Sequence, residues 1–194
     1  MSILTEELPT SLGGVEISSD FRAMIRYETL LFAPSLTSEA KISKILSIFY
    51  PCGYGRMKQL EAWNALQWFY RCGKTATPNT SGGHRSMAAK AYDWEQDAPL
   101  ILAAFQQAYG LDLTEEHIHW WRFRALFDNL PADCRLCKIM EYRVANTEGL
   151  PERTRAYYEK MRRIYALDRH LDPTRPITLE EHDAAFIARL RRNG

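Results

Sequence analysis

The stretch HIHWWRFRALF, from His117 to Phe127, decides the fold, because its residue types suit three different structures. On a strand, the two histidines would point to the same side, where they could hold a metal ion. On a surface, tryptophans beside arginines are typical of single-stranded nucleic-acid binding. The same residues also suit a buried helix. The first two structures would make the chain an enzyme or a nucleic-acid binder, whereas the third leaves its function to other surfaces.

Helix geometry disfavours a metal site in this stretch. We expect Thr114 to cap a helix that Pro131 ends, and successive residues on a helix lie about 100° apart, so His117 and His119 would diverge. Glu116 and His119 would share a side, as in half of a di-iron site, but that site needs a second Glu-x-x-His pair, which the sequence lacks. We therefore predict no metal and no cofactor.

Two sides of this predicted helix carry large apolar residues. Trp121 falls in line with Ile118, while Trp120 aligns with Phe123 on another side. Such a helix is expected to be buried by its neighbours, with its two arginines reaching outward or pairing with nearby acids. The predicted structural core includes Trp63, Phe69, Trp120, Trp121, Phe123 and Phe127.

The composition of the whole chain is that of an ordinary globular protein. Its 194 residues are 46% hydrophobic and 25% charged, with a formal net charge of +1. This balance gives no global field to attract a polyanion or a membrane surface. No apolar run is long enough to span a bilayer and the N-terminus lacks the features of a signal peptide, so we expect the protein in the cytoplasm of its host.

Hydrophobic periodicity predicts a mainly α protein: one compact bundle of seven to eight helices, after a short β-hairpin at Gly13-Gly14. Pro99 leaves two alternatives, a fourth helix that begins at Asp97 or one that is kinked. Two more helices are expected from Thr37 to the break at Pro51 and from about Arg56 to Cys72. The remaining helices are expected to begin at Asp20, Asp133, Pro151 and Thr178.

We expect residues 1–167 to form the helical domain and residues 168–194 a C-terminal helical extension. Residues 74–90 are rich in Thr, Ser, Gly and Pro, which is typical of a flexible loop. In the extension, Thr178-Leu-Glu-Glu181 is a capping box. The apolar residues of that last helix form a candidate partner-binding surface, and they are Leu179, Phe186, Ile187 and Leu190.

No residue pattern indicates catalysis. Cys134-Arg-Leu-Cys137 has neither two further zinc ligands nor a strand-helix-strand setting, so we interpret the two thiols as structural. The acids Asp93, Glu95 and Asp97 suit general acid-base chemistry, but the helix dipole also favours acids at a helix N-terminus. We predict no catalytic residue and no enzymatic activity.

Several blocks of the chain resemble one family. They are DFRAMIRYETLL (20–31), ALQWFYRCGK (65–74), AYDWEQDAPLILAAFQQAYGLDL (91–113), HWWRFRALFDNLP (119–131), KIMEYR (138–143) and YYEKMRRIYAL (157–167). In this order they resemble the bacteriophage gene-product fifteen family over about residues 8–167. The resemblance implies a protein of long-tailed phages, encoded between the major tail protein and the tape-measure protein, where tail assembly chaperones usually lie. The family brings no catalytic residues.

These observations lead to a ranked set of functions. The first is a tail assembly chaperone-like protein that binds the tape-measure protein and an upstream tail assembly protein by a helix-in-groove contact. The alternative is a structural tail component, such as a completion or connector subunit, and the second alternative is a nucleic-acid-binding protein. Partners are therefore expected to be proteins, including a homo-oligomer, with no membrane and no nucleic acid.

Overall fold

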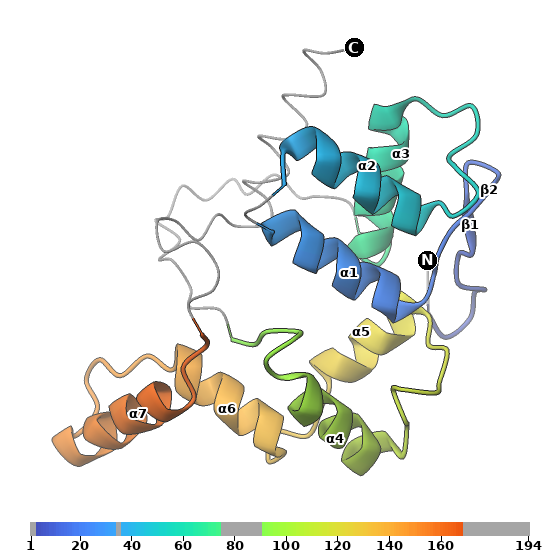
Figure 1. Ribbon diagram of the computed structural model, residues 1–194. Coiled ribbons are helices and arrows are strands. Elements are labelled where there is room, and N and C mark those ends of the chain that lie inside the picture. Colours follow the sequence, from blue (N-terminus) through green and yellow to red (C-terminus); the bar gives the residue numbers. More distant parts are fainter. Residues whose placement is uncertain (1–2, 34–35, 75–90, 169–194) are drawn as a thin grey trace. The chain divides into compact units, whose positions relative to one another are not determined.

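The computed structural model describes residues 3–33, 36–74 and 91–168. The prediction of a mainly α fold with a short N-terminal hairpin is confirmed, because seven helices and two short strands occur in this part of the chain (Figure 1). The eighth predicted helix, at Thr178, lies outside the described residues. The elements are β1 (Ser11–Leu12), β2 (Val15–Glu16), α1 (Phe21–Phe32), α2 (Ser38–Phe49), α3 (Gln59–Tyr70), α4 (Ala98–Tyr109), α5 (Trp120–Asp128), α6 (Arg135–Val144) and α7 (Glu152–Ile164).

The described residues divide into two compact units, where the sequence predicts one helical domain. The first unit contains residues 3–74 and 117–125, and the second contains residues 91–116 and 126–168. Helix α5 contributes its first six residues to the first unit and its last three to the second. The chain therefore leaves the first unit and returns to complete it.

The N-terminal hairpin follows directly from its two glycines. Strands β1 and β2 pair antiparallel, with Leu12 opposite Val15. Gly13 and Gly14 between them have φ angles of 57° and 76°. Two consecutive positive φ angles define the type I′ turn, whose twist matches that of a two-residue hairpin.

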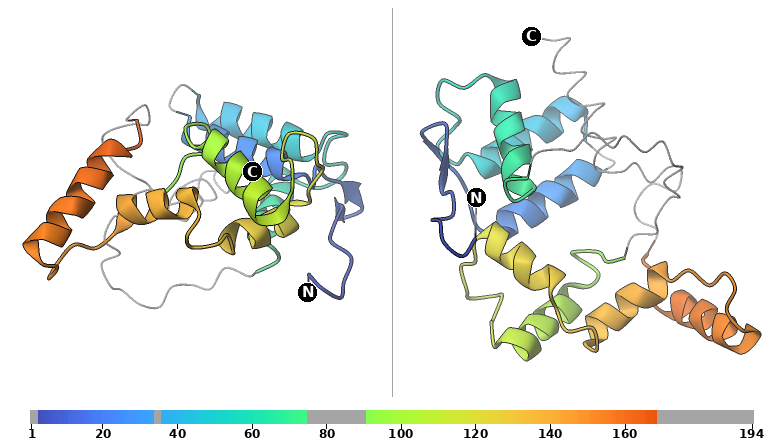
Figure 2. Two further views of the ribbon diagram at one scale, coloured as in Figure 1. Left: turned by 90° about the horizontal axis from the view of Figure 1, so that it is seen from below. Right: turned by 180° about the vertical axis from the view of Figure 1, so that it is seen from behind.

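Helices α1, α2 and α3 build the core of the first unit. Asp20 caps α1 by accepting from the backbone N–H of Arg22, and Thr37 caps α2 by accepting from that of Ala40. Helix α1 packs beside α2 (Figure 1 and Figure 2). The fully buried large side chains of these helices are Met24, Tyr27, Leu31, Ile45, Leu46, Phe49, Trp63 and Phe69.

Two buried polar side chains in this core, Gln67 and Tyr50, donate hydrogen bonds to specific partners. The Gln67 side-chain amide donates a hydrogen bond of 2.8 Å to the Tyr27 hydroxyl, and the Tyr50 hydroxyl donates one of 3.1 Å to the carbonyl of Ala62. Burial raises the pKa of Tyr50 to about 12. These bonds fix α3 against α1 and the end of α2, since an unpaired polar group in the core would be costly.

The predicted start of α5 at Thr114 is wrong, because α5 begins at Trp120. Residues 116–119 run without helical structure and His119 forms an antiparallel bridge with Asp20. The backbone N–H of Phe21 donates to the carbonyl of Ile118, and that of Trp120 donates to the carbonyl of Ser19. These long-range bonds replace the local ones that a longer helix would need.

Two tryptophans of α5 cap the end of α3. The indole N–H of Trp121 donates to the carbonyl of Phe69 at 2.7 Å, and that of Trp120 donates to the carbonyl of Tyr70 at 2.8 Å. The last carbonyls of a helix have no partner within it, and the indole bonds help to satisfy two of them, that of Phe69 together with the backbone N–H of Cys72. The chain then turns away at Gly73, which has a φ of 77°.

We predict that Gly73→Ala lowers the free energy of unfolding by about 2–4 kcal/mol. A left-handed conformation costs a residue with Cβ about 1–2 kcal/mol, and a Cβ here would lie 2.9 Å from Cη2 of Trp121, a rigid ring. Gly53→Ala is the matched control, because Gly53 has a similar φ of 76° and open space around it. Urea denaturation followed by circular dichroism should therefore show a larger loss for Gly73; equal losses would contradict the steric argument.

The second unit contains α4, α6 and α7. Helix α4 begins after Asp97 with Pro99 in its first turn, which selects the first alternative that the sequence left open. It ends at Gly110, whose φ of 66° is left-handed. Helix α6 packs on α4 and α7 packs on α6. The α6 N-cap is Cys134 rather than the predicted Asp133, since the Cys134 sulfur accepts from the backbone N–H of Cys137.

Candidate partner interface

Helix α7 differs from the other helices of the second unit in having no buried residue. Tyr158, Met161 and Tyr165 are half-buried on the side toward α6, whereas Tyr157 and Ile164 are 49% and 58% exposed. All five are apolar or aromatic residues of α7 or of its C-cap, Tyr165. Three of them are therefore partly covered, while Tyr157 and Ile164 keep about half or more of their surface exposed.

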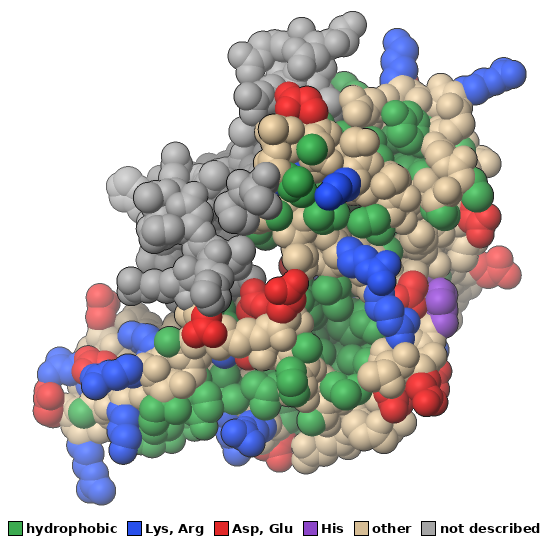
Figure 3. Space-filling view, viewed as in Figure 1, with side chains coloured by type: hydrophobic (Ala, Val, Ile, Leu, Met, Phe, Trp, Pro, Cys, Tyr) green, Lys and Arg blue, Asp and Glu red, His purple; other side chains and the backbone are tan. Residues whose placement is uncertain are grey.

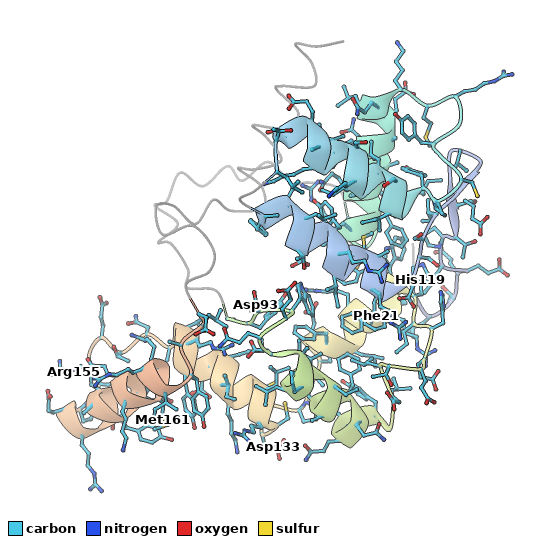
Figure 4. The ribbon with its side chains drawn as sticks, viewed as in Figure 1. Phe21, Asp93, His119, Asp133, Arg155 and Met161 are labelled. Atoms are coloured by element: carbon cyan, nitrogen blue, oxygen red, sulfur yellow. The ribbon has the colours of Figure 1, made fainter. Side chains whose placement is uncertain are left out.

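Four tyrosines join α6 to α7. The ring of Tyr142 on α6 lies 6.0 Å from each of the rings of Tyr157, Tyr158 and Tyr165, measured between centroids. The first two pairs meet edge to face and the third is stacked. Aromatic pairs in these geometries attract each other beyond the effect of buried area. Figure 4, which labels Met161, shows this side of α7 meeting α6.

The hydroxyls of the cluster are also paired. The hydroxyl oxygens of Tyr142 and Tyr157 lie 3.1 Å apart, and the Tyr158 hydroxyl donates to Glu141 at 2.7 Å. The hydrogen bond to Tyr157 raises the pKa of Tyr142 to about 12, and the bond to Glu141 raises the pKa of Tyr158. Tyr142 and Tyr158 therefore remain neutral near pH 7, and the cluster presents rings with polar edges.

One side of α7 carries what we call the α7 stripe: Arg153, Tyr157, Lys160 and Ile164. Their spacing of four, three and four residues places them on one side of a helix. All four are exposed. Figure 3 shows hydrophobic side chains gathered over α6 and α7, with Lys and Arg side chains around them on α7. Tyrosine and arginine are enriched where proteins bind proteins, so this side of α7 is our candidate interface.

A buried ion pair supports α6 beneath the tyrosine cluster. The Arg143 guanidinium forms two parallel bonds with the Asp97 carboxylate, of 2.6 and 2.9 Å, and the two side chains are 5% and 2% exposed. Arg143 also donates to the carbonyls of Ala91 and Tyr165. One side chain on α6 thus fixes the segment before α4, the start of α4 and the end of α7.

The role of Arg143 was not predicted, although the sequence contains a signal for it. Arg143 lies seven residues after Leu136 and four after Ile139, on the same buried side of α6. A charged residue in line with buried ones needs a buried partner. Asp97, which we considered as a possible acid-base residue, is that partner.

The structure places the two histidines of the opening stretch outside any helix, so the geometry assumed for them is wrong. Both ring nitrogens of His119 are engaged. Its Nδ1 accepts from the backbone N–H of Trp121, and its Nε2, which then carries the proton, lies 3.1 Å from the carbonyl oxygen of Pro9. Burial lowers the pKa of His119. Figure 4 labels His119. His117 is exposed, and its Nε2 lies 3.7 Å from a carboxylate oxygen of Asp20.

The i, i+3 pair of Glu116 and His119 also lacks the helix that would bring it together, because α5 begins after both residues. Among the described residues, no group of three or more His, Cys, Asp or Glu side chains is arranged to hold a metal ion. Cys134 acts as the helix cap, and the thiol of Cys137 donates to the carbonyl of Leu130. Burial raises the pKa of Cys137 to about 11, which disfavours the reactive thiolate.

The six residues of the predicted core are all buried. Trp63, Phe69 and Phe123 have no exposed surface, and Trp120, Trp121 and Phe127 are at most 5% exposed. Phe123 stacks on Phe21 with ring centroids 4.4 Å apart. The two tryptophans are therefore not available to stack on bases, although Arg122 beside them is exposed.

The predicted partner-binding residues Leu179, Phe186, Ile187 and Leu190 lie outside the described residues. None of the helices that the structure describes is both long enough and apolar enough to cross a membrane.

Comparison with known proteins gives one match. The family described as Bacteriophage Gp15 protein matches residues 4–167. No curated protein and no solved structure matches the chain.

Proposed function

Because the chain belongs to the Bacteriophage Gp15 protein family, a family of phage structural or assembly proteins, we propose that it is a tail assembly chaperone-like protein that binds the tape-measure protein. We further propose that it has no enzymatic activity and acts in the host cytoplasm during tail morphogenesis. The observation that carries the proposal is α7, a helix with no buried residue that exposes tyrosine, isoleucine and two basic side chains on one side.

The chemistry of this side of α7 suits a helical client. A tape-measure protein is long and largely helical. Its apolar stripes would aggregate unless another protein covers them before the tube subunits enclose them. Tyr157 and Ile164 can pack against such a stripe, while Arg153 and Lys160 can pair with acidic residues beside it. Exposed anchors of this size give moderate affinity. Many copies along one client would then hold it together and still be displaced by tube subunits.

We predict that Tyr157→Ser with Ile164→Ser weakens client binding about ten-fold or more, because loss of two interface anchors costs at least about 1.4 kcal/mol. Ile164 is 58% exposed, whereas Tyr157→Ser also removes a ring contact and a hydrogen bond with Tyr142, so the free energy of unfolding should fall by about 1–2 kcal/mol while the fold is kept. The measurement is co-expression with the neighbouring tape-measure protein, followed by a pull-down and titration of the purified pair.

Leu4→Ser is the matched control. It removes an apolar side chain that is 90% exposed and lies in the other unit, so binding should be unchanged. A tape-measure protein that stays soluble without bound chain would contradict the proposal. Mass spectrometry of purified virions distinguishes the proposed chaperone from the alternative, a structural tail component. A chaperone should be absent from the virion, whereas a structural component should be present in fixed copy number.

A further inference from the structure

We infer that the part of the client that binds α7 is an acidic amphipathic helix, and that the surface which binds it extends from the α7 stripe onto α6. The existence of a client rests on the proposed function, whereas the chemistry of the surface does not.

One side of α6 continues the α7 stripe. Arg135, Lys138 and Tyr142 lie on this side, because intervals of three and four residues place them in line. Arg135 and Lys138 are exposed. Tyr142 contacts Tyr157 of the α7 stripe, with ring centroids 6.0 Å and hydroxyl oxygens 3.1 Å apart. The two lines of side chains therefore join at this pair of tyrosines. We call these three residues of α6 and the α7 stripe together the α6–α7 surface.

Charge is divided unequally within the second unit. Helices α6 and α7 have eight basic and three acidic residues, a net charge of +5. The other described residues of this unit, 91–116, 126–134, 145–151 and 165–168, include ten acidic residues and no basic one. Charges more than about 8–10 Å away are largely screened at physiological salt. A partner on the α6–α7 surface is therefore exposed mainly to positive charge.

The four basic residues of this surface form no ion pair with any residue that the structure describes, and they are Arg135, Lys138, Arg153 and Lys160. Two of the three acids on the same helices are already engaged. Glu141 accepts from the Tyr158 hydroxyl, and Glu152 pairs with Arg155. Carboxylates of a partner can therefore pair with the four bases without breaking an ion pair within the described residues.

The order of residues along the α7 stripe favours a helical partner. Basic and apolar residues alternate there, from Arg153 and Tyr157 to Lys160 and Ile164, over about three turns. A second helix that lies along α7 presents its own residues at intervals of three and four. Its acids can then pair with Arg153 and Lys160 while its apolar residues pack on Tyr157 and Ile164. Such a partner is an amphipathic helix with acidic and apolar residues in alternation.

The tyrosines disfavour a nucleic acid as the partner, although basic and aromatic residues together can bind one. A base stacks on a free ring face. The ring of Tyr142 instead packs against three other tyrosine rings, those of Tyr157, Tyr158 and Tyr165. Ile164, which is 58% exposed, offers a contact to an apolar side chain and none to a phosphate.

Binding of labelled synthetic peptides to the full-length chain, measured by fluorescence anisotropy, tests the preference for an acidic helix. The first peptide has Glu and Leu alternating at intervals of three and four over about 15 residues, with Ala and Gln elsewhere. Lys replaces each Glu in the second peptide, and Ser replaces each Leu in the third. The first should bind about ten-fold more tightly than either of the others, and its affinity should fall as salt is raised.

Arg135→Glu with Lys138→Glu tests the part of the surface on α6. This variant should bind the first peptide about ten-fold more weakly and the second more tightly, because the sign of the charge is reversed. A gain for the second peptide cannot come from unfolding, so it separates charge from folding. Lys44→Glu with Arg56→Glu is the matched control. Both are exposed basic residues of the other unit, and their replacement should leave both affinities unchanged.

Equal affinities for the first two peptides, or unchanged affinities in the α6 variant, overturn the acidic partner. So does an oligothymidylate that binds more tightly than the first peptide and is lost in the α6 variant, which assigns the surface to nucleic acid. Dimers at low salt that the α6 variant abolishes, measured by light scattering, overturn it in favour of a second copy.

The tape-measure protein itself distinguishes this inference from the proposed function. If it binds the wild-type chain and the α6 variant equally well, the acidic client is wrong and the proposed function stands. If it binds neither, while the peptides behave as expected, the proposed function is wrong and the preference of the surface for an acidic helix stands.

Discussion

Replacing Asp97 by alanine is expected to lower the free energy of unfolding by about 3–5 kcal/mol, since it leaves the Arg143 guanidinium buried without its carboxylate. The two side chains are among the few buried charged groups in the described residues. Arg143 is 6% exposed, and its other bonds hold it between the carbonyls of Ala91 and Tyr165. Chemical denaturation followed by circular dichroism measures the loss.

Two further variants distinguish the ion pair from a general loss of packing. Asp133→Ala removes an exposed aspartate of the same unit and should cost less than about 1 kcal/mol. Asp97→Leu combined with Arg143→Met should recover part of the loss, because removing both charges leaves none uncompensated. If the double variant were as unstable as the sum of its single changes, the pair would not act as a unit.

Trp121→Ala should cost a similar amount, about 3–5 kcal/mol, but in the first unit. The side chain is 4% exposed, and its ring packs against Trp68 and Phe69. Its removal leaves a cavity and also removes one of the two hydrogen bonds to the carbonyl of Phe69, which keeps the bond from the backbone N–H of Cys72. Thermal unfolding by circular dichroism measures the effect. Arg122→Ala, at the exposed neighbouring position, is the control and should change stability by less than about 0.5 kcal/mol.

The contact of Trp121 with Gly73 adds a coupled test. In a Trp121→Phe background the Cη2 atom that a Cβ at residue 73 would meet is absent. Gly73→Ala should then cost only the backbone term of about 1–2 kcal/mol. An unchanged cost in that background would show that the indole is not the obstacle.

The sequence was sufficient for those features that depend on near neighbours. The glycines of the hairpin and the caps at Asp20 and Thr37 were predictable because each acts within about four residues, and the same local rules limited Pro99 to two alternatives, of which the structure shows the first. The start of α5 was not, because Thr114 is a good helix cap in isolation. Its backbone N–H and hydroxyl instead donate to Asp112, and the hydrogen bond from its hydroxyl lowers the pKa of that carboxyl.

The candidate interface was predictable only in part. A helix that starts near Pro151 was predicted, but periodicity alone does not say which of its apolar residues, such as Tyr157 and Ile164, a neighbour covers. The ion pair of Asp97 and Arg143 joins residues 46 positions apart, and no local pattern identifies such a partner. Both cases depend on tertiary packing.

The shared helix α5 has a consequence for synthesis on the ribosome. The first unit takes Trp120 and Trp121 from a segment that follows the whole of α4. Until Trp120 and Trp121 have been synthesised, α1 to α3 therefore lack the two indole rings that cap the end of α3. A nascent chain arrested before residue 120 should be open to protease at residues 69–73, and one arrested well after residue 125 should be protected there.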